Sequence, residues 1–92
     1  MDLIERTAQY RYRPLEKYLD ERYANTVVLL FKEIEDILGF PLPGAAWLQP
    51  DWWSNPAPDE TPSDQSLSWT SAERTAGVNL AARKVTFTRA FA

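Results

Sequence analysis

The chain has 92 residues and contains neither cysteine nor histidine, which excludes disulfides, thiolate or imidazole metal ligands, thiol nucleophiles and histidine-based catalytic triads. Ten lysines and arginines against 13 aspartates and glutamates give a net charge of −3, which argues against strong nucleic-acid binding by the whole surface. This length predicts one domain, residues 1–92, with one modest core.

Residues 1–11 are polar and weakly periodic, and we expect them to form an N-terminal arm. They lack the apolar segment of a signal peptide, and the longest apolar run of the chain, residues 27–31, is too short to span a bilayer. The sequence therefore predicts a cytoplasmic protein that does not insert into a membrane.

Residues 12–54 form a predicted helical core that contains one strand. Leu15, Tyr18 and Leu19 recur at helical spacing behind Pro14, which predicts a helix over 14–23. The run at 27–31 predicts a strand that is apolar on both faces. Either both faces are covered, or Val28 and Leu30 offer an apolar stripe to a partner, including a second copy in a homodimer.

The periodicity continues into a second helix, predicted over 32–38, which Gly39 is expected to end. Pro43 can begin a third helix that extends to Leu48, and Pro50 suits the first turn of its continuation through Trp53. Two helices joined by a short turn with a glycine indicate a helix-turn-helix.

Residues 55–68 contain three prolines and three acids, and we expect a mobile loop because such a segment buries little apolar area. Over 69–92, apolar and polar residues alternate in two runs separated by residues 81–84, which predicts a β-hairpin.

The element order is thus helix, strand, helix, helix, strand, strand. This order indicates a small winged-helix-like α+β domain whose third helix enters the major groove of duplex DNA and whose hairpin lies over phosphates.

The charge of the C-terminal segment agrees with a phosphate-facing hairpin. Four cations stand against Glu73 alone, so that residues 73–92 carry a charge of +3. The candidate phosphate contacts are Arg74, Arg83, Lys84 and Arg89. The alternative is a solvated hairpin with ordinary surface charge.

Several sequence blocks recur together in one known pattern. They are Ile34-Glu35-x-Ile37-Leu38-Gly39, Leu42-Pro43, Trp52-Trp53-x-Asn55, Ala76-Gly77 and Val85-x-Phe87-x-Arg89. Over about residues 12–89 the chain resembles a family of small uncharacterised domains of bacterial and phage proteins, and this resemblance implies no activity. Where the pattern has Thr or Ser, this chain has Leu30, so its second helix is expected to lack a capping side chain.

Adjacent tryptophans on a helix point about 100° apart, so Trp52 is expected in the core and Trp53 on a groove or partner surface, unless both are buried. An exposed Trp53 could stack on a base or anchor a protein interface. Asn55 could read adenine, although a role as a helix C-terminal cap is favoured. Trp47 and Trp69 are expected in the core.

Catalysis is not expected. Glu33 and Glu35 lie two residues apart and do not share a helix face, and three glycines provide no phosphate-cradling loop. We predict no catalytic residue, metal or cofactor.

The favoured function is a non-catalytic winged-helix-type nucleic-acid-binding module. The alternative is an acidic, phage- or mobile-element-encoded module that binds and inhibits a host or defence protein complex, a role that the net charge of −3 and the acidic loop at 51–64 would favour.

Overall fold

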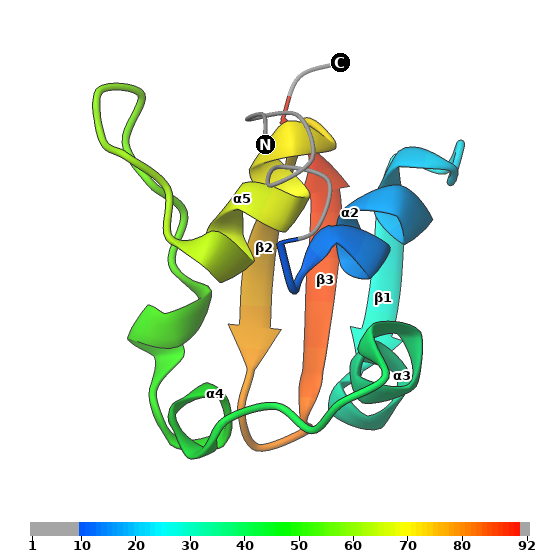
Figure 1. Cartoon of the computed structure of the whole chain (residues 1–92), viewed down its shortest axis with the longest axis vertical. Coiled ribbons are helices and arrows are strands. Elements are labelled where there is room, and N and C mark those ends of the chain that lie inside the picture. Colours follow the sequence, from blue (N-terminus) through cyan, green and yellow to red (C-terminus); the bar gives the residue numbers. More distant parts are fainter. Residues whose placement is uncertain (1–9, 91–92) are drawn as a thin grey trace, which may run out of the picture.

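The computed structural model describes residues 10–90, so most of the predicted N-terminal arm lies outside the described range. Its elements are, in order, α2 (Arg13–Asp20), β1 (Thr26–Leu30), α3 (Phe31–Leu38), α4 (Gly44–Leu48), the 3-10 helix η1 (Pro50–Trp53), α5 (Asp64–Ser71), β2 (Arg74–Asn79) and β3 (Lys84–Arg89). The predicted α+β class is confirmed (Figure 1). No helix within residues 10–90 is long and apolar enough to cross a membrane.

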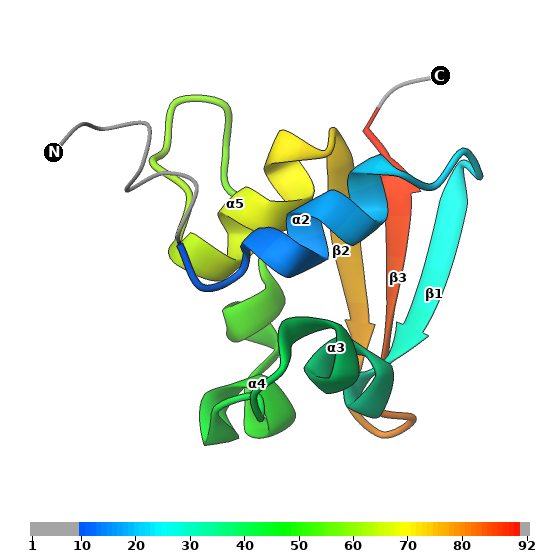
Figure 2. The same ribbon diagram turned by 45° about the vertical axis from the view of Figure 1, so that its right-hand side comes forward.

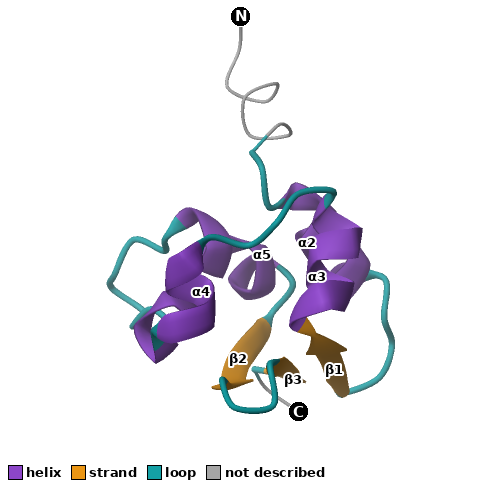
Figure 3. Ribbon diagram, turned by 90° about the horizontal axis from the view of Figure 1, so that it is seen from below, coloured by secondary structure: helices purple, strands orange, loops and turns teal. Residues whose placement is uncertain are grey.

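The three strands form one antiparallel sheet in the order β1-β3-β2. The helices gather on one of its faces, as the two views from the side and from below show (Figures 2 and 3). Side chains that point toward the helices are buried, among them Leu29, Val85 and Phe87. Their neighbours along each strand point to the uncovered face, where Val28 and Thr88 are exposed.

Helices α2 and α3 lie close to the positions that local sequence signals predict. Helix α2 contains Pro14 in its first turn, as predicted, but ends at Asp20 rather than at residue 23. Gly39 ends α3 with a left-handed φ of 83°, and its N–H donates to the carbonyl of Glu35 (2.8 Å). Leu30 has no side-chain acceptor, so only the other half of a capping box forms, in which the Glu33 carboxylate accepts from the Leu30 N–H (2.8 Å).

The predicted loop over 55–68 is wrong in its second half, because residues 64–71 form helix α5. The sequence carries a start signal for this helix: Ser63 is the N-cap and its hydroxyl accepts from the N–H of Ser66 (3.3 Å). The helix escaped prediction because two serines, Ser66 and Ser68, share its buried face with Trp69, so that the segment lacks a helical repeat of large apolar residues. Their small side chains let α5 lie against α2 and β2.

A chain of aromatic rings runs through the core between the helices and the sheet. Trp53 stacks on Phe31 and on Trp69, with ring centroids 5.2 and 5.9 Å away. Trp69 contacts Phe87 of the central strand (5.8 Å), and Trp47 meets the edge of Phe31 (5.1 Å). Because these rings come from four helices and one strand, they join every layer of the domain.

Candidate nucleic-acid interface

The four hairpin cations do not form one strip, because the strand register separates them. Arg74 pairs with Arg89 at one end of the hairpin, and Asn79 pairs with Lys84 at the other. The two pairs are five positions apart along the extended strand, a distance of about 17 Å. Each end of the hairpin therefore has its own role.

At the first end, Arg74 is buried and holds the turn that follows α2. Its guanidinium donates to the carbonyls of Arg22 (3.0 Å), Ala24 (2.9 Å) and Asn25 (3.2 Å). Arg89 donates to the carbonyl of Arg22 as well (3.2 Å). Burial, and secondly the charge of Arg89, lower the pKa of Arg74. Arg74, 2% exposed, is therefore a structural residue, which corrects its predicted role as a phosphate contact.

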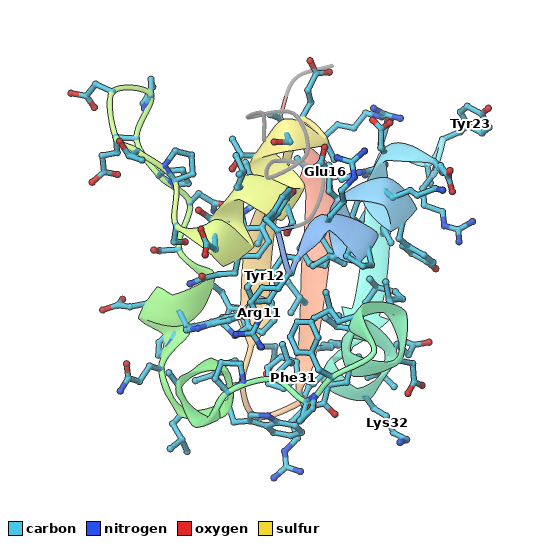
Figure 4. The ribbon with its side chains drawn as sticks, in the orientation of Figure 1. Arg11, Tyr12, Glu16, Tyr23, Phe31 and Lys32 are labelled. Atoms are coloured by element: carbon cyan, nitrogen blue, oxygen red, sulfur yellow. The ribbon has the colours of Figure 1, made fainter. Side chains whose placement is uncertain are left out.

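At the second end, a backbone hydrogen bond joins the hairpin turn to the start of α3. The N–H of Phe31 donates to the carbonyl of Arg83 (2.8 Å), which brings Lys32 beside the turn. In the register of β1 and β3, Lys84 lies opposite Leu30. The structure thus gathers three cations from two distant segments, and Figure 4 shows Lys32 at this end of the molecule.

Arg83 is held in place by its backbone and by an aromatic ring. Its φ of 56° is left-handed, which non-glycine residues adopt mainly in tight turns. Its guanidinium carbon lies 5.1 Å from the centroid of the Trp47 ring, a cation–π arrangement that leaves the residue exposed. We call the surface formed by Lys32, Trp47, Arg83 and Lys84 the hairpin-tip surface. The hairpin does not project as a free wing, because its tip rests on α3 and α4 (Figure 1).

Lys32 was missed in the sequence, although it is the only cation between residues 22 and 74. The sequence could not reveal that Lys32 follows a residue bonded to Arg83, because that hydrogen bond, from Phe31, depends on the pairing of β1 with β3. Asp36 follows Lys32 by four residues on α3, the spacing at which opposite charges on a helix surface are neighbours.

The two adjacent tryptophans are arranged opposite to the prediction. Trp53 is 2% exposed, and its indole N–H donates to the carbonyl of Ala46 (2.8 Å). Trp52 is half-buried at the rim, with its ring 6.0 Å from that of Tyr12. The segment is a 3-10 helix that starts at Pro50, so the spacing of an α-helix does not apply to it. Trp53 therefore contacts the core and is not available for a base or a partner.

Asn55 is neither a helix cap nor available to read a base. Its amide oxygen accepts from the N–H of Ala76 (2.8 Å) and from the indole N–H of Trp69 (3.0 Å), and its amide nitrogen donates to the carbonyl of Ala76 (2.9 Å). The side chain thereby pairs with β2 as a neighbouring strand would. It covers the middle of this sheet edge and fixes the orientation of the Trp69 ring.

We expect Asn55→Ala to lower the free energy of unfolding by about 1–3 kcal/mol, because the buried indole N–H of Trp69 loses its acceptor and both polar groups of Ala76 lose their partners. Asn79→Ala is the matched control, since Asn79 accepts one exposed N–H, that of Ala82 (2.9 Å), and should lose about 1 kcal/mol or less. Urea unfolding followed by circular dichroism measures both. Equal losses in the two variants would contradict the role of Asn55 as an edge partner.

Helix α4 takes the place of the predicted third helix but carries no charged or amide side chain. It consists of five residues, GAAWL. Direct readout of base edges in the major groove uses arginine, lysine, asparagine, glutamine and acidic side chains. The sequence-reading role that the winged-helix order assigns to this helix therefore has no residues to perform it.

The acidic loop between η1 and α5 lies away from the hairpin tip (Figure 1). In Figure 1 the loop between η1 and α5 extends from the opposite corner of the molecule. One of its carboxylates, that of Glu60, accepts from the N–H of Ala57 (2.6 Å) and closes the turn at the tip of the loop. No group of three acidic, histidine or cysteine side chains suited to a metal ion occurs in the part of the chain that the structure describes.

Comparison with known proteins gives one match. The family described as "Domain of unknown function (DUF7662)" matches residues 12–90, which is nearly the whole range of the fold. Neither a curated protein nor a solved structure matches the chain.

Proposed function

The chain belongs to this DUF7662 family, whose description assigns no activity. From the geometry of the hairpin-tip surface, we propose that the protein is a non-catalytic module that binds the phosphate backbone of duplex DNA. The observation that carries the proposal is the convergence of Lys32, Arg83 and Lys84, which the hydrogen bond between Phe31 and Arg83 brings to one end of an otherwise acidic domain. Phosphate contacts need local cations and do not need a positive net charge.

The arrangement of Arg83 supports this role. A guanidinium binds phosphate through two parallel hydrogen bonds, and the contact with Trp47 restricts its motion before binding. Less side-chain freedom is then lost when a phosphate arrives. Lys84 stands on the neighbouring, uncovered face of the sheet, so the two cations can contact successive phosphates.

The proposed mode is winged-helix-like in topology but differs in what touches the DNA. Element order and the sheet order β1-β3-β2 agree with a winged helix, whereas α5 is an addition and the hairpin tip is tied to α3. Because α4 lacks base-reading side chains, the contacts go to the backbone, and binding has little preference for sequence.

Removing one cation of the surface tests the proposal. Each phosphate contact contributes about 0.9 to the slope of log affinity against log salt, so Arg83→Ala and Lys84→Ala should each reduce the slope by about 0.9. Lys17→Ala is the control: it removes the same charge from an exposed position on α2 and should leave the slope unchanged. Fluorescence anisotropy with a labelled 20-base-pair duplex measures the slopes. If all three variants behave alike, DNA does not contact the hairpin-tip surface.

A protein partner is the second candidate, favoured by Leu48 at the end of α4. This side chain is 77% exposed and follows Trp47 in the chain, and an exposed apolar side chain adjoining an aromatic residue, the class that is enriched at protein interfaces, enlarges the apolar surface open to a partner. An acidic module of this kind would bind a basic surface of its partner through its loop at 54–63, and would thereby compete with the partner's own ligand. Leu48→Ser discriminates the two candidates, because it should leave DNA binding unchanged and abolish capture of a protein partner.

A further inference from the structure

Exposed apolar side chains concentrate at one edge of the sheet. Within residues 10–90, four large hydrophobic side chains are exposed, namely Tyr23 (95%), Leu48 (77%), Val28 (52%) and Leu30 (49%). Three of these four lie in β1 or in the turn that leads into it. Figure 4 shows Tyr23 extending from the body beyond one end of β1, whereas Lys32 marks the other end.

The backbone of β1 leaves polar groups free along the same edge. Two hydrogen bonds, from Phe31 to Arg83 and from Arg89 to Asn25, show that the odd-numbered residues of this strand face β3. Even-numbered residues therefore direct their N–H and C=O groups outward. The Leu30 N–H is occupied by the Glu33 carboxylate, which leaves both backbone groups of Val28, at the centre of the edge, without a partner in the described part of the chain.

The sequence of this edge lacks the usual protection against strand pairing. Exposed edge strands commonly carry lysine, proline or other charged residues, yet residues 24–31 contain none of these. The opposite edge of the sheet differs, because the Asn55 side chain occupies the backbone groups of Ala76. Among residues 10–90, only β1 combines an uncharged sequence, backbone groups without a partner and exposed apolar side chains.

We propose that a second copy of this chain pairs antiparallel with β1 around a two-fold axis at Val28, so that two three-stranded sheets form one six-stranded sheet. In this register Val28 lies opposite the partner's Val28, and Leu30 lies opposite the partner's Thr26. A two-fold axis places identical residues against each other, and like charges on the axis would repel. The uncharged Val28 therefore permits this pairing.

The same register gives Tyr23 a role. It places this ring near the start of the partner's helix α3, beside the partner's Lys32 and the partner's Glu33. An aromatic ring next to an ammonium group is a favourable contact. The interface contains two backbone hydrogen bonds from Val28 and a small apolar contact. It is below the size of a tight dimer, and we expect a dissociation constant of about 0.1–1 mM.

Val28→Lys tests the dimer, because it places two like charges on the axis. Thr75→Lys is the matched control: Thr75 is exposed on the same face of the sheet in the other edge strand, β2. Sedimentation equilibrium from about 10 μM to 2 mM should show a rising average mass for the wild type and Thr75→Lys, and a monomer for Val28→Lys. A wild type that stays monomeric throughout, or equal dissociation by both substitutions, would overturn the proposal.

Amide NMR spectra of the wild type at both concentrations provide a test that requires no variant. The signals of Thr26 and Val28 should shift with concentration while those of Ala76 and Val78, on the opposite edge, stay in place. Shifts confined to residues outside β1 would refute this interface. These measurements contain no DNA, so their outcome is independent of the proposed binding function.

Discussion

Trp53→Ala is expected to lower the free energy of unfolding by about 3–5 kcal/mol, the range for removing a large buried aromatic side chain. The variant loses the stacking contacts with Phe31 and Trp69 and leaves a cavity where α4, η1 and α5 meet. It also leaves the carbonyl of Ala46 without its indole donor. If the domain lies at the lower end of the usual stability range of about 5–15 kcal/mol, this loss removes most of its free energy of unfolding.

Trp52→Ala is the control for this prediction, because it removes the same side chain from the neighbouring, half-buried position. Its ring contacts Tyr12 and Trp53 at the rim of the core, and we expect a loss of about 1–2 kcal/mol. Chemical unfolding monitored by circular dichroism compares the two variants without relying on tryptophan fluorescence. A larger loss for Trp52→Ala would mean that the two rings are oriented in the opposite way.

Arg74→Ala should have the second-largest effect, a loss of about 2–4 kcal/mol. The turn between α2 and β1 then loses the charged donor for the carbonyls of Arg22, Ala24 and Asn25, and hydrogen bonds from charged groups are stronger than neutral ones. Arg74→Lys should recover part of the loss, because a single ammonium group cannot span three carbonyls.

Hydrogen exchange gives a second readout for Arg74. The N–H of Arg89 donates to the carbonyl of Asn25, so its protection should fall when the turn loosens in Arg74→Ala. Arg83→Ala, an exposed cation at the other end of the hairpin, should change stability by less than about 1 kcal/mol. If the two alanine variants were equally stable, Arg74 would be a surface cation, as its position in a basic segment first indicated.

The contrast between these two arginines shows what the sequence could and could not predict. The apolar run at 27–31 located β1 to within one residue, alternation of apolar and polar residues revealed the hairpin of β2 and β3, and Gly39 marked the end of α3. Local patterns of this kind depend on neighbours within a few residues. Whether a cation faces the core or the solvent depends on what the fold places opposite it, and for Arg74 the partners lie about 50 residues away.

The same reasoning applies to α5 and to the tryptophan pair. Helix α5 packs through Trp69 and two serines, so its mostly polar sequence resembled a loop even though Ser63 signalled a helix start. For Trp52 and Trp53, an assumed α-helical geometry predicted the opposite orientation, because the local 3-10 geometry is set by Pro50 and by packing. Both errors come from tertiary contacts that override or replace the local signal.

The proposed function rests on three cations, and their number is measurable. If Lys32, Arg83 and Lys84 each contact one phosphate, the affinity of the wild-type protein for a 20-base-pair duplex should fall with salt at a log–log slope of about −2.7. Between 50 and 200 mM salt the affinity should then drop about 40-fold. Anisotropy titrations over this range, with two duplexes of unrelated sequence, should yield the same slope and similar affinities. Absence of binding at 50 mM salt and about 100 μM protein, or binding that does not depend on salt, would contradict phosphate recognition by the hairpin-tip surface.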